Sequence, residues 1–423
     1  MKDWLEKHLC DLNLTKTMER PEGFCRLGYT EEEWKSIDVF VMIAENLGLK
    51  VHRDEAGTAI ARWEPDRAES LPAIAVGSHL DTVKGGGGYD GVAGVLCGLA
   101  AIKKLKEEGF QPICPIELIC FASEESSRFG VSTIGSKAMS GLLNKEELES
   151  IKDEHGLTIR QAVENMGLNW DKIDKARRTE SELKSFIELH IEQGTRIEDH
   201  SAEFGVVTAI ACPIRLKVKI TGQMGHTGTT PMGKRKDALV VAAPLIQFIS
   251  EAAESLSVAS EFPIVATVST IELKPNAMNV IPGIVELGVD IRSVDDQLKD
   301  KMKELITDKC IQLEQSFGVK MELTTLVNNP SVQLDAKVRG KLQEAGESLG
   351  YKARILESGA GHDVMNMAAK WPSGLIFIRC RNGLSHHPEE FASLDDLHLG
   401  TEIISQYIKN EAGQEQKRKS RWK

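Results

Sequence analysis

The stretch Gly77-Ser78-His79-Leu80-Asp81-Thr82-Val83 decides the fold, and four glycines, Gly85 to Gly88, lead from it to Asp90. The apolar run 73–76 predicts a buried strand that ends at Gly77, and the apolar-periodic segment after Asp90 predicts a helix. Ligands of open α/β sheets bind at the carboxyl ends of the strands. The stretch therefore predicts an α/β sheet with an imidazole and a carboxylate at that edge.

The glycine loop leaves two other interpretations open. Glycines between a strand and a helix can cradle a phosphate, but no Lys-Ser/Thr follows them here, so the P-loop fingerprint is absent. A flexible turn with a surface His79 is the second alternative. The rest of the chain counts against it, because other strands also end in polar residues.

Length and composition limit the class of protein. The chain of 423 residues is long enough for two domains, and its 41% hydrophobic residues can build real cores. A net charge of -11 counts against nucleic acid or an anionic membrane as a partner. We find no signal segment, no run of about 18 apolar residues and no C-x-x-C spacing among the cysteines. A cytoplasmic protein with reduced thiols is therefore expected.

A second apolar run ends in carboxylates. Residues 116–122 predict a buried strand, which Glu124 and Glu125 follow closely. Adjacent carboxylates at a strand end are costly unless they are solvated or bind a cation. Beside His79 and Asp90 at the same sheet edge, a metal explains them better than a solvated acidic loop does.

A third run, residues 186–194, predicts a strand that carries Glu188, His190 and Glu192 on one face. A lone strand histidine is more often a core or surface residue than a ligand. His190 becomes a candidate because the other strand ends already supply the remaining ligand types.

Two segments are expected to be structural. Thr30 and Glu33 predict a capping box at the start of a helix that ends near Gly48. Residues 145–185 are charged and predict helix without evident chemistry. The basic tail, residues 417–423, is expected to be disordered and receives no role.

The sequence pattern changes at residue 212. From there to residue 325 the chain predicts the order β-α-β-β-α-β of a ferredoxin-like sandwich. Such a unit can be inserted into a larger one because domain termini lie close together. We therefore predict an α/β fold with a mixed, mostly parallel sheet flanked by helices. Its catalytic domain comprises residues 1–211 and 326–423, and an inserted α+β lid or dimerisation domain comprises residues 212–325.

The polar residues at strand ends form one set: His79, Asp90, Glu124, Glu125, His190 and His386. Imidazole and carboxylate without thiolate suit Zn²⁺, Mn²⁺, Co²⁺ or Ni²⁺. A carboxylate shared between two such ions makes a two-metal site about 3.5–4 Å across. No single residue is diagnostic, but their joint order along the chain is.

This order resembles the hydantoinase/carbamoylase family of binuclear zinc amidohydrolases. That family includes N-carbamoyl-L-amino-acid hydrolases, β-ureidopropionases and allantoate amidohydrolases, and is related in fold to aminoacylase and carboxypeptidase G, the co-catalytic zinc exopeptidase type. The resemblance covers nearly the whole chain. Its motifs are G-S-H-L-D-T-V, the glycine run to Asp90, S-E-E-S-S-R-F, E-L-H-I-E-Q-G, G-H-T-G-T-T-P-M, N-V-I-P-G, D-I-R-S, G-A-G-H-D and S-H-H-P-E-E.

The resemblance implies a ligand for each position of a two-metal site, with Zn²⁺ the first expectation. Asp90 would bridge the two ions. His79 and His190 would complete one ion, and Glu125 and His386 the other. His386 rather than its neighbour matches the S-H-x-P pattern of the family.

The resemblance also implies three catalytic roles. Glu124 would be the general base toward a metal-bridging water, and Asp81 would orient His79. His226 of the inserted domain would stabilise the oxyanion at the active site of the other subunit, which implies a homodimer formed through the inserted domains. Without the resemblance, a turn histidine among glycines would be the preferred interpretation of His226.

Substrate binding is implied for a further set. Arg292 and Asn279 would hold the α-carboxylate of the substrate, since a guanidinium binds a carboxylate through two parallel hydrogen bonds. Gln193, Gly361 and His362 are weaker candidates for substrate contact. Without the resemblance, Arg292 would also fit a surface strand.

The predicted enzyme cleaves the ureido C–N bond of an N-carbamoyl-L-amino acid to give the amino acid, CO2 and ammonia. Allantoate amidohydrolase and N-acyl-L-amino acid deacylase are the enzymatic alternatives, and an inactive metal-binding protein is the non-enzymatic one. Allantoate-specific members carry a Gln-Arg-like pair early in the lid strand, where this chain has Ala211-Cys212-Pro213-Ile214-Arg215. This difference favours N-carbamoyl amino acids.

Overall fold

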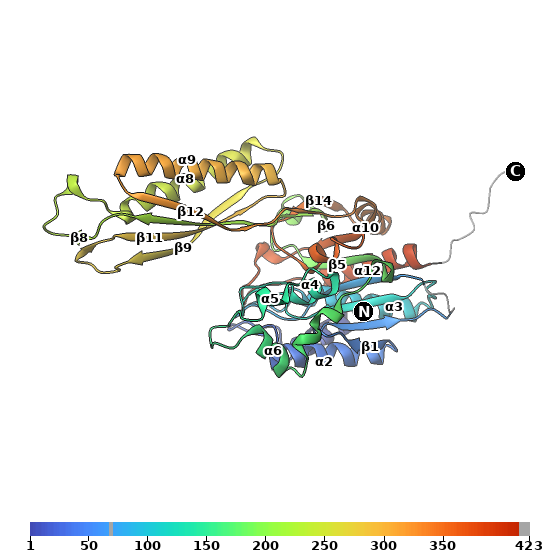
Figure 1. The fold of residues 1–423 in the computed structure, drawn as a ribbon. Coiled ribbons are helices and arrows are strands. Elements are labelled where there is room, and N and C mark those ends of the chain that lie inside the picture. The colour runs from blue at the N-terminus through green and yellow to red at the C-terminus, as the bar shows by residue number, and fades with distance from the viewer. Residues whose placement is uncertain (67–70, 414–423) are drawn as a thin grey trace. The chain divides into compact units, whose positions relative to one another are not determined.

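The computed structural model describes residues 1–66 and 71–413, which divide into two compact units (Figure 1). The first unit comprises Met1–Thr208, Gln333–Leu356 and the chain from His362 onward, and the second comprises Ala209–Val332 and Glu357–Gly361. The segment expected as an insertion, residues 212–325, lies within the second unit. The basic tail at residues 417–423 lies outside the described residues.

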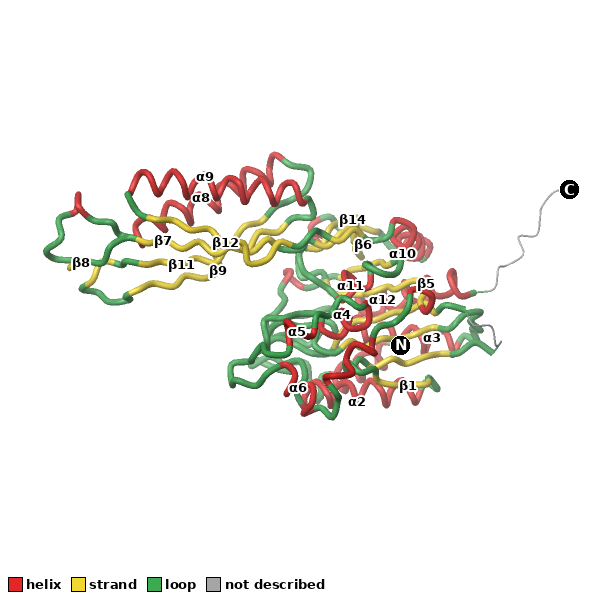
Figure 2. The backbone as a smooth tube through the Cα atoms, viewed as in Figure 1, coloured by secondary structure: helices red, strands yellow, loops and turns green. Residues whose placement is uncertain are grey.

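A mixed sheet forms the centre of the first unit (Figure 2). Its strands lie in the order β1-β2-β4-β3-β5-β15-β6-β13, and β14 pairs with β6. Strands β4, β3, β5 and β15 are parallel neighbours, whereas β1, β2 and β6 pair antiparallel. Their bounds are Lys50–Arg53 (β1), Ala59–Trp63 (β2), Ala73–His79 (β3), Ile116–Phe121 (β4), Leu183–Ile191 (β5), Phe204–Ile210 (β6), Val332–Gln333 (β13), Ala353–Ser358 (β14) and Ser373–Ile378 (β15).

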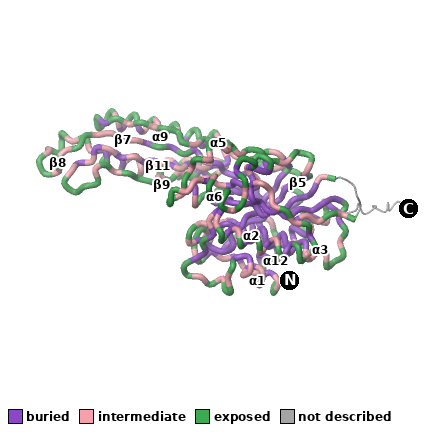
Figure 3. The backbone as a smooth tube through the Cα atoms, turned by 60° about the horizontal axis from the view of Figure 1, so that its bottom comes forward, coloured by how far each residue is buried: buried purple, intermediate pink, exposed green. Residues whose placement is uncertain are grey.

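The parallel strands are covered on both faces, as their continuous apolar sequences predict. Strands β3, β4 and β15 are buried at every position, and β5 at all but one (Figure 3). On one face, Ile187 and Leu189 of β5 join the core that α3 and α12 complete. Between them, Glu188 accepts the N–H of Val364 from α11, which therefore covers the other face.

The helices of the first unit fall into two sets. The set that shares the main core is α1 (Lys2–Leu12), α2 (Glu31–Asn46), α3 (Val92–Glu107), α10 (Ala336–Ser348) and α12 (Leu394–Ala412). The remaining helices are α4 (Ile134–Ser140), α5 (Lys145–Leu148), α6 (Ile159–Asn165), α7 (Arg196–Asp199) and α11 (Asp363–Met367). The predicted α/β fold, a mixed sheet flanked by helices, is confirmed, and the parallel pairing is confined to the central strands β4, β3, β5 and β15.

The second unit is a ferredoxin-like sandwich. Its antiparallel sheet has the order β12-β7-β11-β9, and α8 and α9 lie together on one of its faces (Figure 1). Strand β7 alternates between buried and solvent-facing residues, which explains its period-two sequence. The bounds are Ile214–Thr221 (β7), Ala238–Ala259 (α8), Val265–Lys274 (β9), Ile284–Arg292 (β11), Asp296–Phe317 (α9) and Lys320–Asn328 (β12), with a small ladder of Gly225–His226 (β8) and Val280–Ile281 (β10).

Helix α8 is unusually apolar. Within the described residues it is the one helix that is long and apolar enough to cross a membrane, judged by length and composition. Its residues Ala238, Val241, Leu245 and Ile249 pack in the core of the second unit. That packing accounts for the apolar sequence on the inner side of the helix.

Two local predictions were wrong. Glu33 does not close a capping box, because its Oε2 accepts the N–H of Tyr29, the residue before the cap, at 2.5 Å. Thr30 does cap α2 through the N–H of Glu33, at 3.4 Å. Residues 145–182 contain the short helices α5 and α6 and 3-10 turns at 170–176 and 180–182, and β5 begins at Leu183, since a charged composition suits exposed loops as well as helices.

Candidate active site

The polar strand ends meet at one edge of the larger sheet. Strand β3 ends at His79, β4 is followed by Glu124 and Glu125, and His190 lies near the end of β5. These strands are parallel neighbours, so their carboxyl ends lie side by side. The loop after β15 adds His386.

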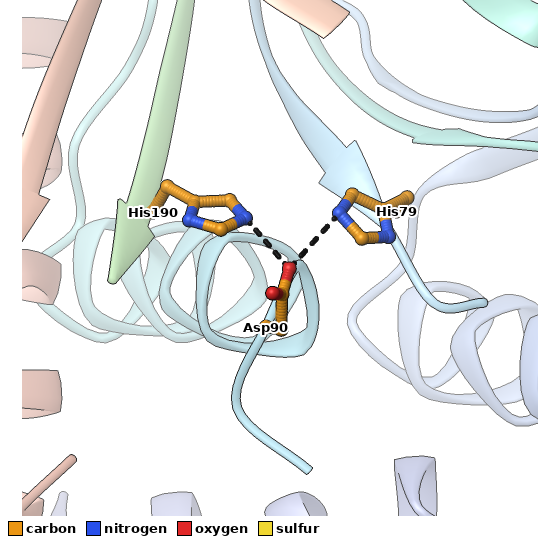
Figure 4. A group of neighbouring side chains, drawn as sticks. All are labelled: His79, Asp90 and His190. Carbon is orange, nitrogen blue, oxygen red and sulfur yellow. Dashed lines mark ion pairs between the residues drawn. The ribbon is translucent and has the colours of Figure 1, made fainter. Parts of the chain in front are cut away.

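The first group of candidate ligands is His79, Asp90 and His190, whose ligand atoms all lie within 4.8 Å of one another. Nε2 of His190 is 2.9 Å from Oδ1 of Asp90, and Nε2 of His79 is 3.5 Å from the same oxygen. Figure 4 shows both imidazoles turned toward this carboxylate. All three residues are buried.

The second group is Asp90, Glu125 and His386, again with ligand atoms within 4.8 Å of one another. Nε2 of His386 lies 3.4 Å from Oδ2 of Asp90 and 3.4 Å from Oε1 of Glu125. Asp90 therefore belongs to both groups and offers a different oxygen to each. This is the arrangement that a shared carboxylate in a two-metal site requires.

Hydrogen bonds orient the two buried imidazoles. Nδ1 of His79 lies 3.1 Å from the carbonyl of Asp81 and 3.3 Å from its carboxylate, and Nδ1 of His190 lies 2.8 Å from the carbonyl of Ile191. Oxygens that only accept hydrogen bonds place the ring proton on Nδ1. Each Nε2 then presents a lone pair toward Asp90 that can ligate a cation, and that of His190 also accepts the N–H of Gly91, at 3.2 Å.

The charges of the site favour a bound cation. Burial alone would raise the pKa of Asp90, but His190, His386 and His79 outweigh it and hold that pKa well below the ordinary value. Burial, Glu125 and Asp363 raise the pKa of Glu124 well above its ordinary value against the opposing effect of His79. Buried carboxylates this close together are costly without positive charge, so the donor set fits divalent ions.

The same carboxylates shift the pKa values of two of the histidines. Burial would lower the pKa of His79, yet Glu124, Asp81 and Asp90 raise it well above its usual value. Hydrogen bonds to Asp90 and Glu125 raise the pKa of His386 to about 10. A ligating nitrogen must give up its proton, so cation binding at this site releases protons.

Three side chains hold Asp90 in place: Glu390, Gln193 and Ser385. Of these, only Gln193 was a predicted site residue, and its predicted role was substrate contact. Glu390, which the sequence analysis missed, accepts the N–H groups of Tyr89 and Asp90 with one oxygen, at 3.0 and 2.9 Å. Gln193 and Ser385 donate to Oδ2 of Asp90, at 2.7 and 2.9 Å. The motif S-H-H-P-E-E contains Ser385 and Glu390, but its local pattern does not reveal a partner 300 residues earlier.

Two positions of the glycine loop lie so close to neighbouring side chains that only glycine fits there. A Cβ on Gly87 would lie 2.2 Å from the Glu390 carboxylate, and one on Gly91, whose φ is +66°, would lie 2.5 Å from the His79 ring. The run Gly86 to Gly91 also matches G-x-G-x-x-G letter by letter. The carboxylates of Asp90 and Glu390 at this turn oppose a phosphate there.

His362 packs behind the predicted ligands. It is buried, and its ring centroid lies 4.5 Å from that of His190 and 5.5 Å from that of Phe377. Burial lowers the pKa of His362 well below its ordinary value. Its observed contact therefore supports His190, while Gly361 is exposed and belongs to the second unit.

The remaining candidates lie in the second unit. Arg292 bonds to Asp290 through Nε at 2.8 Å and to the carbonyl of Gly359 through Nη1 at 3.0 Å. His226 is exposed, and its Nδ1 accepts the N–H of Gly228 at 3.0 Å, so Nε2 carries the proton of the neutral ring. Asn279 is exposed and precedes Val280, the strand partner of His226.

These candidates occupy opposite ends of one sheet. His226 and Asn279 lie beyond the end of β11 where Ile284 pairs with Thr221, whereas Arg292 follows Ile291, which pairs with Ile214. At about 3.3 Å per strand residue, the two ends are roughly 26 Å apart. Arg292 and Asn279 of one chain therefore cannot hold the same small carboxylate.

A mixed sheet whose carboxyl edge gathers two overlapping groups of imidazole and carboxylate ligands defines a metal-dependent hydrolase. The sequence matches Peptidase family M20/M25/M40 over residues 75–410, and the chain belongs to that family. Together with the relatives and the solved structure described next, this match confirms the resemblance to the hydantoinase/carbamoylase group and the prediction of a hydrolase.

Several relatives whose names state an activity are similar to this chain over most of its length. An N-carbamoyl-L-amino-acid amidohydrolase of Paenarthrobacter aurescens is 37% identical over 391 residues, covering 92% of this chain and 93% of that protein. A ureidoglycolate hydrolase of Arabidopsis thaliana is 36% identical, covering 90% and 80%. An allantoate amidohydrolase of Bacillus subtilis is 32% identical, covering 91% and 92%. The crystal structure of a hydantoinase/carbamoylase family amidase from Burkholderia multivorans superposes with a TM-score of 0.85 at 30% identity, covering 98% of each chain.

Proposed function

We propose that the protein hydrolyses the ureido C–N bond of an N-carbamoyl-L-amino acid to give the amino acid, CO2 and ammonia. The observation that carries the proposal is the pair of ligand groups that share Asp90, with Glu124 beside them. The relative named N-carbamoyl-L-amino-acid amidohydrolase supports this substrate. His79, Asp90, His190, Glu125 and His386 would hold the two divalent ions, with Zn²⁺ the first expectation.

Glu124 would move the proton of the reaction. Its carboxylate is buried, and its Oε2 lies 3.7 Å from Nε2 of His79. The same turn after β4 also carries Glu125. Bound divalent ions would polarise the ureido carbonyl and lower the pKa of a water to roughly 7. Glu124 would take the proton of the attacking water and return it to the leaving nitrogen of the amino acid.

Asp81 would act from behind these groups. Its carboxylate lies against Nδ1 of His79 and accepts the N–H groups of Glu124 and Glu125, at 3.1 and 2.8 Å. One carboxylate thus orients a ligand imidazole and the backbone of the proposed base. Second-sphere contacts of this kind tune ligand basicity and orientation.

The second unit would supply substrate contacts from two chains. Arg292 of one subunit would bind the α-carboxylate, and His226 and Asn279 of a second subunit would complete the site. The separation of roughly 26 Å along β11 supports this division, since one chain cannot bring both ends to one small molecule. The Nε2–H of His226 is free of the Gly228 contact and suits an oxyanion donor.

A homodimer through the second unit is the assembly that this division requires. Apolar side chains are exposed on α8, where Val240 and Val258 are 54% and 85% exposed, and on β9, where Val265 and Ile271 are 58% and 52% exposed. Strand β9 is also an edge of its sheet and offers unpaired backbone groups. Exposed apolar surface beside an open strand edge fits a second copy of the same chain.

The alternative within the same chemistry is allantoate, because a relative of that name is 32% identical. Allantoate and N-carbamoyl amino acids both release ammonia, whereas N-acyl amino acids do not. A panel of all three classes, read by ammonia and by free amino acid, separates them. The proposal expects N-carbamoyl-L-amino acids to give the largest kcat/KM, and turnover of N-acyl substrates alone would overturn it.

The matched variants for this panel are Glu124→Gln and Glu389→Gln. Glu124→Gln should keep the metal content and lower kcat by about 10²–10⁴-fold, as expected for loss of a general base. Glu389 is exposed and one residue from Glu390, so its substitution should leave kcat within about twofold. Full turnover in Glu124→Gln would reject the assigned base.

A further inference from the structure

The turn that carries Glu124 and Glu125 is held by its carbonyl groups on one side. Three successive carbonyls of the turn accept successive N–H groups from the start of α4. The pairs are Gly135 to Ala122 at 3.0 Å, Ile134 to Ser123 at 3.0 Å and Thr133 to Glu124 at 2.6 Å. This fixes the direction in which the chain leaves β4.

The N–H groups of the same turn are held by two carboxylates. Asp81 accepts the N–H groups of Glu124 and Glu125. Glu33 accepts the N–H of Ser123 through Oε1 at 2.7 Å. Three consecutive backbone amides therefore point into two buried acidic side chains that lie far from each other in the sequence.

Glu33 is an unusual residue for this position. It lies in the first turn of α2, 90 residues before Ser123, and is fully buried. Its second oxygen accepts the N–H of Tyr29, so both oxygens bind main chain. The carboxyl group thus joins the start of α2 to the turn after β4.

The anchored residue has a strained backbone. Ser123 has a φ of 52°, in the left-handed region that non-glycine residues rarely occupy. The side chain of Ser123 packs directly against Gly28. A side chain at residue 28 would collide with it, because an added Cβ would lie 2.2 Å from Oγ of Ser123. Such a conformation persists when its surroundings over-determine it, and the Glu33 bond is one of those constraints.

We propose that Glu33 is a positioning residue for the hydrolytic reaction, whose carboxylate holds the left-handed turn at Ser123 and thereby fixes Glu124 over the substrate. The inference rests on the proposed function, because it needs Glu124 to be the base. The side chain of Glu33 bonds to the backbone of Tyr29 and Ser123, and it would act on Glu124 through the Ser123 amide. A displacement of about 1 Å at a reacting group can lower the rate about 10²-fold.

The first test compares Glu33→Gln with Glu32→Gln. In Glu33→Gln the new side-chain amide can accept one N–H through its oxygen, but its NH₂ group opposes the second donor, so the anchor to Ser123 or Tyr29 is lost. Glu33→Gln should lower kcat by about 10–100-fold and leave KM and metal content within about twofold. Glu32 is exposed in the same helical turn, and its substitution should change neither constant.

The second test uses rescue. Glycine adopts a φ near 52° without strain, so Ser123→Gly should restore most of the lost kcat in the Glu33→Gln background. This double variant also keeps the test usable if Glu33→Gln alone folds poorly. A kcat of Glu33→Gln equal to that of Glu32→Gln would overturn the inference, and so would a lost kcat that Ser123→Gly leaves unchanged.

Hydrogen exchange provides a measure that does not depend on turnover. Loss of the anchor should speed exchange of the Ser123 amide by at least about tenfold, while the amide of Ile134, held by the carbonyl side of the turn, keeps its protection. Unchanged exchange at Ser123 counts against Glu33. An unmodified protein that turns over no ureido or acyl substrate would instead reject the proposed function, and the exchange result would still report on the anchor.

Discussion

Replacing Gly94 by alanine tests whether the packing of α3 sets the geometry of the site. An added Cβ at Gly94 would lie 2.2 Å from the carbonyl oxygen of Leu189 and 2.7 Å from Cβ of Ser78. These residues are the immediate neighbours of His190 and His79. Asp90 closely precedes the same helix, so the contact couples the helix position to both ligand groups.

The size of the effect follows from that contact. Ordinary contact needs about 3.5 Å, so α3 must retreat by roughly 1 Å and carry Asp90 away from His190, now 2.9 Å from it. Overpacking of this kind costs about 1–3 kcal/mol, and the better helix propensity of alanine returns about 1 kcal/mol. Because the obstacle is the backbone of a central strand, we expect a net loss of about 2 kcal/mol in Gly94→Ala.

Gly98→Ala is the matched control, one helical turn further on. Its Cβ would meet only the side-chain ends of Leu118 at 3.2 Å and Val76 at 3.6 Å. We expect stability unchanged or raised by up to about 1 kcal/mol. Urea unfolding of the metal-free protein measures the packing, and metal retention during dialysis measures the site. Equal stability and equal metal retention in the two variants would refute the reasoning.

Two further predictions concern titration and assembly. Burial raises the pKa of Asp54 to about 7 although its backbone hydrogen bonds oppose this, so the folded state binds a proton more tightly than the unfolded state. The stability from Asp54 is therefore complete below about pH 4 and is lost as pH rises through about 7, and Asp54→Asn should remove this pH dependence. Identical pH profiles in urea unfolding would contradict this. Mixing inactive His226→Ala subunits with inactive Glu124→Gln subunits should restore about a quarter of the activity. Half of the random dimers are then mixed, and each mixed dimer has one complete site of its two. If the subunits are shown to exchange and no activity returns, a shared site is excluded.

The candidate ligands could be predicted because their signal is local. Each follows or ends an apolar strand, and parallel strands bring their carboxyl ends to one edge, so His79, Glu125 and His190 could be placed together without coordinates. The order of the motifs then identified the family. The six-element pattern of the second unit is equally local, because each strand and helix shows its own period in the sequence, although β7 pairs with the distant strands β11 and β12.

The sequence failed where a side chain finds its partner far along the chain. Glu33 fits a capping box by spacing, but the folded protein gives its carboxylate to Ser123, 90 residues away. Glu390 supports Asp90 from 300 residues away, and no periodicity connects them. For Arg292 and Asn279, which are close in sequence, the structure adds a constraint of a different kind, because an extended strand carries them to opposite ends of a sheet.

The sequence by itself determined which residues are candidates to carry the chemistry, because apolar runs that stop at histidine, aspartate or glutamate are visible one strand at a time. Only the tertiary structure decided how those residues are aimed. Gly94 sets the depth of α3, Asp81 and Glu33 fix the turn before the proposed base, and Glu390 fixes the backbone of Asp90. These contacts join segments through the folded core, where distance in space has no counterpart in distance along the chain.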